Sequence, residues 1–321
     1  IIEQLLEQLA QAGDGGVTEP PLGDPPPGHW AFYGAEGSWT CCNSPEYLGG
    51  NTATGTLILT TGEPVDGGDF QRGAPYLVGG TIALNAVDSY GNPVVMNFPP
   101  DYAQVGSSDG YGGIADPFLP FSGEGPDGWI GGEGYDNIAI GTFYESGGEV
   151  LRVLNDGPGG GFGSGYFVAG QPTPLADMAV LAGFVEPVVG LYWGESLLLG
   201  YGLELGVDFT AGTWGGSFYG GEGEGFDFNA SGDFVGTAAV SDRITAPDSY
   251  ITAIDGSVKF SFMGQDAEVI GGNFDVTAQY SGGSYYERVT DVFMAFGEEL
   301  VPRGDLPGPI DEIVHEPRDP N

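Results

Sequence analysis

Strand-length segments dominate the second half of this chain and limit what it can fold into. Between Tyr135 and Phe296, short runs rich in β-branched, aromatic and small residues follow one another, separated by turn clusters. Many runs alternate apolar and polar residues, which places one face inside and the other in water. Eight or more short antiparallel strands favour a small closed barrel, because closure leaves no free strand edge. We therefore expect an all-β barrel domain over residues 135–299, with Gly215–Gly216 and Gly271–Gly272 at its bends.

The region before the barrel, residues 30–134, is also β-rich. Thr54–Thr61 (TGTLILTT) and Gly80–Val87 (GTIALNAV) have the composition and length of strands. Residues 100–134 are rich in Gly, Pro and aromatic side chains and show no long period. They are expected to form a loop, either a binding loop or a cover over a sheet edge.

Both ends of the chain differ from the β-rich middle. Residues 1–12 (IIEQLLEQLAQA) have the spacing of an amphipathic helix, residues 13–29 are a Pro/Gly linker, and residues 300–321 are a Pro-rich tail. Three helical turns are too few to be stable alone in water, so this helix needs an apolar surface. We expect a second copy of the chain to supply it, with these side chains as assembly contacts: Ile2, Leu5, Leu6 and Leu9.

Charge excludes several classes of partner. The chain has 45 Asp and Glu against 7 Lys and Arg, a formal net charge of −38, which repels nucleic acid and anionic membranes. Such a surface suits a saline or divalent-rich exterior, where counterions screen its self-repulsion. No apolar run reaches the roughly 18 residues of a transmembrane helix, and the first residues lack a basic region. If the protein is exported, we expect this sequence to be the processed form, without its signal peptide.

The cysteines are Cys41 and Cys42, which are adjacent in the sequence. This spacing does not fit a C-x-x-C metal site. The pair suits an oxidising compartment, either as a strained vicinal disulfide or as bridges to other chains.

Residues 166–280 resemble the β-barrel lobe of transferrin-binding-type Gram-negative surface lipoproteins. The stretch YFVAGQPTPLADMAVLAGFVEPVVGLYWGE is similar to the opening of that lobe, GVDFTAGTWGGSF to a later strand, and DGSVKFSFMGQDAEVIGGNFDV to a hairpin. Ala179 stands where the family usually has Pro. The matching positions are Gly170, Pro172, Thr173, Pro174, Met178, Gly183, Tyr192, Gly194, Asp208, Phe209, Thr213, Gly216, Phe262, Gly264, Ala267, Glu268, Gly271, Gly272 and Phe274.

The resemblance covers about the C-terminal half of the chain and implies several properties. It implies an eight-stranded up-and-down barrel beside a handle-like β-region, display on the outer surface of a Gram-negative cell, and capture of haem or a host iron carrier. The chain departs from the family at its first residue, because a lipidated mature protein begins with Cys and this sequence begins with Ile1. The matching residues belong to barrel architecture rather than to partner contacts.

Calcium is the metal that the sequence favours. Gly131–Ala139 fits one copy of the G-G-x-G-x-D-x-U-x calcium repeat, with Asp136 as the ligand. A calcium roll needs stacked copies, whereas isolated Asp and Glu loops also suit a hard cation. Haem would need an axial Tyr or His in an apolar pocket, and the sequence singles out neither.

Enzymatic motifs are incomplete. Gly106–Gly110 fits G-x-S-x-G, but His29 and His315 lie beside proline-rich segments and offer no base. Gly123–Gly128 fits G-x-G-x-x-G, yet its Pro removes an amide and its carboxylates repel phosphate. Aromatic residues such as Tyr285–Tyr286 are expected to fill the barrel or to lie on its surface.

Three functions are compatible with the sequence. The first is a structural or adhesive surface subunit that self-associates, even into filaments, through its terminal segments. The second, implied by the resemblance, is capture of haem or a host iron carrier. The third is an enzyme, which we do not expect because no nucleophile, base and orienting group can be assembled. The sequence favours the first.

Overall fold

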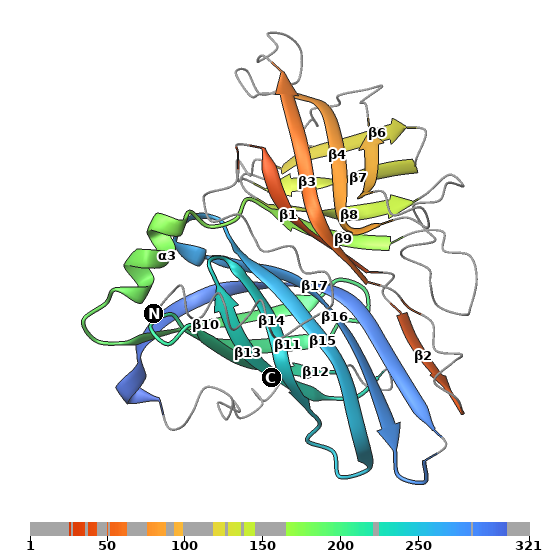
Figure 1. Ribbon diagram of the computed structural model, residues 1–321, viewed down its shortest axis with the longest axis vertical. Coiled ribbons are helices and arrows are strands. Elements are labelled where there is room, and N and C mark those ends of the chain that lie inside the picture. Colours follow the sequence, from red (N-terminus) through yellow and green to blue (C-terminus); the bar gives the residue numbers. More distant parts are fainter. Residues whose placement is uncertain are drawn as a thin grey trace, which may run out of the picture.

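The protein is mostly β in the computed structural model, which describes residues 26, 28–35, 38–43, 50, 52–62, 76–87, 93–98, 118–125, 128–135, 138–144, 165–220, 225–283 and 285–306. The described strands form two sheets that lie against each other, with one short α-helix, α3 (Leu175–Ala182), at the end of the larger sheet (Figure 1). The expectation of an all-β fold is confirmed. The predicted helix 1–12, most of the linker 13–29 and most of the tail 300–321 fall outside the described residues.

The larger sheet is a closed antiparallel barrel with up-and-down topology. Each strand pairs with the next along the chain, and the last pairs with the first, so the predicted eight-stranded barrel is confirmed. A ninth strand, β2 (Ser38–Cys42), pairs with the first residues of β17. These residues precede the part of β17 that pairs with β10. The barrel strands are β10 (Val188–Ser196), β11 (Gly202–Asp208), β12 (Thr213–Tyr219), β13 (Phe228–Val235), β14 (Ala238–Thr245), β15 (Ile251–Met263), β16 (Val269–Tyr280) and β17 (Tyr286–Pro302).

The second sheet, here called the side sheet, is antiparallel and has the order β5-β4-β3-β1-β9-β8-β7-β6. It corresponds to the handle-like region that the family resemblance implied. Its strands are β1 (His29–Ala35), β3 (Thr52–Gly62), β4 (Tyr76–Val87), β5 (Pro93–Phe98), β6 (Phe118–Gly125), β7 (Gly128–Tyr135), β8 (Ile138–Tyr144) and β9 (Gly165–Gly170).

Two sequence expectations differ from this arrangement. β8 and β9 were expected in the barrel, but they pair with β7 and β1 in the side sheet, so the barrel strands begin at Val188 rather than near residue 135. β6 and β7 form a hairpin inside the stretch expected as a loop, residues 100–134. Alternation identifies a strand but not the sheet it joins, and glycine-rich strands lack the side chains that would reveal them.

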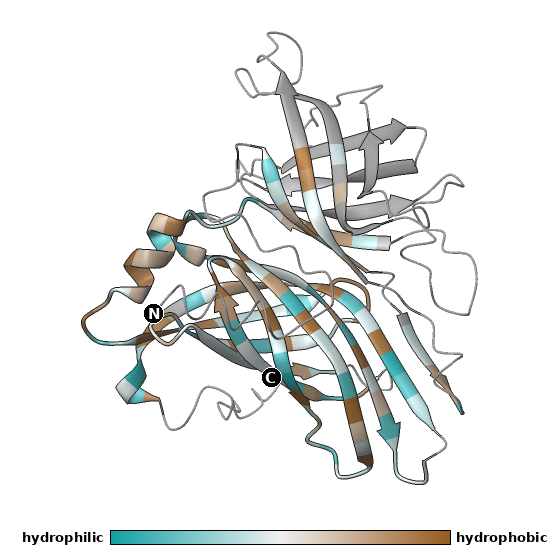
Figure 2. Cartoon of the chain, in the orientation of Figure 1, coloured by the Kyte–Doolittle hydropathy of each residue, from teal (hydrophilic) through white to brown (hydrophobic). Residues whose placement is uncertain are grey.

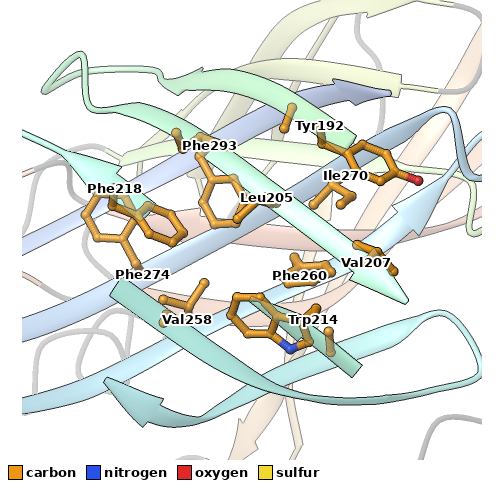
Figure 3. Close-up of a cluster of buried hydrophobic side chains, with 14 of the residues drawn as sticks. Tyr192, Leu205, Val207, Trp214, Phe218, Val258, Phe260, Ile270, Phe274 and Phe293 are labelled. Atoms are coloured by element: carbon orange, nitrogen blue, oxygen red, sulfur yellow. The ribbon is translucent and has the colours of Figure 1, made fainter. Parts of the chain in front are cut away.

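Aromatic side chains fill the barrel interior. Hydrophobic and hydrophilic residues alternate along the long strands (Figure 2), and the inward set meets at the centre (Figure 3). The rings of Phe218 and Phe228 stack with centroids 4.6 Å apart, and Trp214 meets Phe260 edge to face at 4.8 Å. Eight strands make a barrel just wide enough for side chains to fill, and these rings fill it.

Glycine permits the close approach of neighbouring barrel strands, at the closing seam between β10 and β17 and between β11 and β12. A Cβ at Gly194 would lie 1.9 Å from the carbonyl oxygen of Met294, and a Cβ at Gly216 would lie 2.6 Å from that of Glu204. Both are positions of the family resemblance. Their role is therefore to permit contact between neighbouring strands, whereas the sequence suggested bending, and only for Gly216 of these two.

Buried polar contacts join the barrel to the side sheet. Asn273 on β16 donates from Nδ2 to the carbonyl oxygens of Gly34 on β1 (3.0 Å) and Ala53 on β3 (2.8 Å). The hydroxyls of Tyr33 and Ser261 lie 2.7 Å apart in the same interface. Burial raises the pKa of Tyr33 to about 12. Because these bonds are buried, they fix how the two sheets meet.

Candidate functional site

The barrel has two different ends. At one end, α3 closes the interior: Met178 and Leu181 are buried in the main core cluster. The same segment exposes Val180, Phe184 and Val185 to solvent, which makes a small apolar patch. The helix therefore caps this end of the barrel and leaves a small apolar patch on the outer surface.

The opposite end, here called the mouth, is formed by the connections that follow β10, β14 and β16, together with the described part of the connection after β12. Strands β15 to β17 are 12 to 17 residues long, against 7 for β11 and β12, and they extend past the rest of the barrel (Figure 1). β14 pairs with β15 only through Ala238–Val240, so the first part of β15 lies beyond the closed region. Partly buried apolar residues, among them Ile251 and Ile254, continue the core toward solvent there.

Two tyrosines and a glutamate meet at the mouth, and we call them the tyrosine–glutamate cluster. Tyr280 donates to Oε2 of Glu287 at 2.8 Å, and Tyr285 donates to Oε1 at 3.0 Å. The two rings meet edge to face with centroids 5.4 Å apart. Glu287 is only 8% exposed, whereas Tyr285 is 38% exposed. The cluster therefore holds a buried carboxylate behind an accessible aromatic ring.

The electrostatics of the cluster are negative. Burial, then the hydrogen bond and charge of Glu287, raise the pKa of Tyr280, with Asp248 adding to the effect. A hydrogen bond with Cys41 is the largest cause that raises the pKa of Tyr285, followed by burial and Glu287. Both phenols therefore stay protonated as hydrogen-bond donors at neutral pH, and the formal charge rests on the carboxylates.

Asp291 anchors the connection after β10. Its carboxylate is completely buried and accepts from the backbone amides of Leu198 at 3.1 Å and Leu199 at 2.7 Å. Burial raises the pKa of Asp291, against the opposing effect of these amides and of Ser196. The mouth thus has a fixed edge, and Leu198 is exposed on it.

Only some of the site residues predicted from the sequence lie within the described part of the chain. Cys41 and Cys42 lie on β2, exposed and half-buried respectively, and the structure records both as thiols rather than as a vicinal disulfide. Neighbouring residues of an extended strand point to opposite faces, and Cys41 is the one paired in register with Glu287. The predicted calcium ligand Asp136 and the predicted assembly contacts Ile2, Leu5, Leu6 and Leu9 lie outside the described residues.

Sequence reasoning missed the residues of the mouth, apart from naming Tyr285–Tyr286 as aromatic. The available signal was polar residues on an inward face, since Glu287 and Asp291 alternate with the buried Val289 and Phe293. That signal can be interpreted only once the inward face is known, because 45 acidic residues make such coincidences common.

Within the described ranges, no group of three or more His, Cys, Asp or Glu is placed to hold a metal ion. In that same part of the chain, no helix has the length and apolarity needed to cross a bilayer. The family-matched residues that are described serve the architecture. Tyr192, for example, donates from its buried hydroxyl to the carbonyl oxygen of Ala267 at 2.7 Å.

The fold defines a class: a closed eight-stranded antiparallel barrel packed against an antiparallel side sheet. No protein-family model and no curated protein sequence matches the chain. Solved structures do show similarity. One is the isotype 1 transferrin-binding protein B of serogroup B Neisseria meningitidis, with 15% identity, a TM-score of 0.33, and coverage of 78% of this chain and 58% of that one.

Two further structures are similar. A mutant transferrin-binding protein B from Haemophilus parasuis Hp5 is 10% identical, with a TM-score of 0.34 and coverage of 85% of this chain and 76% of that one. A surface lipoprotein is 13% identical, with a TM-score of 0.27 and coverage of 83% and 98%. The chain spans less than two thirds of the meningococcal structure.

Proposed function

We propose that this chain belongs to a non-enzymatic protein displayed on the outside of a Gram-negative cell, where it captures an extracellular iron-carrier protein through the mouth of its barrel. The sequence motifs of residues 166–280 support this proposal. So does the combination of a closed barrel with a side sheet, which is the architecture that those motifs imply. The acidic composition suits a saline exterior.

The filled barrel interior is the observation that carries the proposal. An eight-stranded barrel either packs its own side chains inside or leaves room for one small ligand. Here Phe274 lies 5.7 Å from Phe218 and 6.3 Å from Phe293, centroid to centroid, and all three are buried. Internal haem would have to displace these rings, so recognition at the outer surface is favoured over carriage of haem inside.

The mouth is better suited to protein recognition than the α3 end. Interfaces concentrate their binding energy in tyrosine, tryptophan and arginine, surrounded by polar groups that fix orientation. The mouth offers exposed Tyr250 and Tyr285 on connections held by backbone hydrogen bonds, such as that from Ser281 to Tyr250 at 2.7 Å. The patch beside α3 offers one phenylalanine and two valines, with little polar surface to orient a partner.

The proposal differs from the self-associating subunit that the sequence favoured. The residues predicted for assembly lie outside the described part, so self-association stays a prediction and rests on the sequence alone. An enzymatic role is not proposed, because the buried carboxylates Glu287 and Asp291 are bonded to phenols and backbone amides rather than to a nucleophile and its base.

The experiment is a binding measurement with the full chain immobilised. Transferrin, lactoferrin and haemoglobin are passed over it by surface plasmon resonance, and haemin is titrated separately by absorbance. We expect saturable binding of one iron-carrier protein and no stoichiometric haemin spectrum. Stoichiometric haemin binding without binding of any carrier would contradict the proposal.

A further inference from the structure

We propose that the tyrosine–glutamate cluster is a receptor for a basic side chain, an arginine or lysine, presented by the captured protein. This inference rests on the proposed function, because it names the chemistry by which the mouth would recognise its partner. It assigns Glu287 the charge, and Tyr280 and Tyr285 the aromatic walls.

The geometry suits a cation. An ionised carboxylate has about four lone-pair sites, and the two phenols occupy one on each oxygen of Glu287, so acceptor capacity remains. Aromatic faces attract a cation placed over the ring, and arginine uses this contact often. Tyr285 is the exposed wall of the cluster and donates to the Glu287 carboxylate, so it is the ring that a guanidinium arriving from solvent would meet.

Among the described residues, no basic side chain forms a salt bridge with the Glu287 carboxylate. The nearest basic residue on the same strand, Arg288, belongs to the opposite face and is committed to Asp275 by two hydrogen bonds of 2.8 and 2.7 Å. Asp248, Asp227 and Asp291 add negative potential, as their effects on the pKa values of Tyr280 and Tyr201 record. A net charge of −38 makes a basic partner the complementary one.

A second aromatic residue borders the cluster. Trp39 lies on β2 two positions before Cys41, and alternation places both on the face that Glu287 and Val289 share. Its side chain is 37% exposed. The mouth therefore presents tryptophan and tyrosine around one buried carboxylate, a composition typical of sites that bind organic cations.

The test uses a defined probe, the acetylated and amidated peptide of three arginines, with the citrulline peptide of equal shape and no charge as comparator. Affinity for the full chain is measured by tyrosine and tryptophan fluorescence at low and physiological salt. We expect the arginine peptide to bind and the citrulline peptide to bind at least tenfold more weakly. Equal binding of both peptides, or of neither, overturns the inference.

Two variants distinguish binding at the tyrosine–glutamate cluster from attraction of the peptide by the overall negative charge. Glu287→Gln should weaken the arginine peptide about tenfold, because a charge-assisted contact is lost. Asp255→Asn is the matched control, since it removes one charge from an exposed carboxylate on β15 whose hydrogen bond is to Gly256. It should change affinity less than about twofold. Equal losses in both variants would mean long-range attraction only and would overturn the inference.

A second substitution protects against misfolding of the Glu287 variant. Tyr285→Leu changes an exposed ring and should also weaken the arginine peptide severalfold, while a cooperative melting transition shows that the variant stays folded. Wild-type affinity in Tyr285→Leu contradicts the role of the aromatic wall. The peptide result is independent of iron carriers: peptide binding without carrier binding refutes the proposed function alone, whereas carrier binding unaffected by Glu287→Gln refutes the receptor alone.

Discussion

Single residues determine whether the barrel can close. Gly194 lies on β10 opposite Ala295, and its missing side chain leaves room for the backbone of β17. The sequence marked this glycine through the family resemblance but gave no reason for it. The reason is steric, and it appears only when the first and last strands are brought together.

Gly194→Ala should lower the free energy of unfolding by about 2 kcal/mol, because the added methyl group overlaps the carbonyl of Met294. Gly202→Ala is the control, since a Cβ there meets nothing within 4 Å. Urea denaturation of both variants measures the difference. Equal stabilities would show that the strands are not held this close.

Asp291 predicts a specific pH dependence. Its raised pKa means that the native state keeps this proton at a pH where the unfolded chain has released it. The native state is therefore relatively more stable when acid protonates the buried carboxyl, and loses that advantage as pH rises through the native pKa. Asparagine imitates the protonated form at every pH.

The stability of the wild type minus that of Asp291→Asn should consequently rise as pH falls from 7 toward 4. Chemical denaturation at several pH values gives this difference and cancels the titration of the other acidic groups. A difference that falls on acidification would mean that the backbone amides of Leu198 and Leu199 outweigh burial.

At the scale of elements, alternation in the sequence predicted strands well and their partners poorly. The segment that became β8 alternates in the same way as the barrel strands, yet it pairs with β7 and β9 in the side sheet. Membership of a sheet depends on non-local pairing, which the period of a single strand does not encode. The eight-stranded barrel itself was predictable from the number of strands and from the motifs.

Asn273 should govern how firmly the side sheet is attached. Asn273→Ala leaves the carbonyl oxygens of Gly34 and Ala53 without this buried donor, which should cost about 2 to 4 kcal/mol. Chemical denaturation of the whole chain, together with hydrogen exchange in β1 and in the barrel strand β12, measures the cost. Unchanged stability of both sheets would contradict the role of this contact.

At the scale of the whole molecule, the position of the two thiols refines the prediction of covalent assembly. Cys41 is exposed at the mouth, whereas Cys42 is partly covered on the other face of β2. We expect any disulfide between chains to use Cys41. On non-reducing electrophoresis, oxidised wild type and Cys42→Ser should form dimers, and Cys41→Ser should not; dimers of Cys41→Ser would contradict this expectation.

Self-association through the terminal segments is a separate prediction. Removal of residues 1–28 should abolish any higher-order assembly and leave the barrel folded, because Ile2, Leu5, Leu6 and Leu9 are the predicted contacts. Sedimentation velocity compares the two proteins. If the full chain and the shortened chain both assemble and sediment identically, these residues are not part of the interface.

Recognition at the mouth of a filled barrel can be measured directly by hydrogen–deuterium exchange of the full chain with and without a bound iron-carrier protein. We predict slower exchange in residues 246–254 and 280–287 on binding, with the inner parts of β12 and β13 unchanged. Protection confined to the α3 patch or to the side sheet, with the mouth unaffected, would contradict recognition of the iron carrier at the mouth.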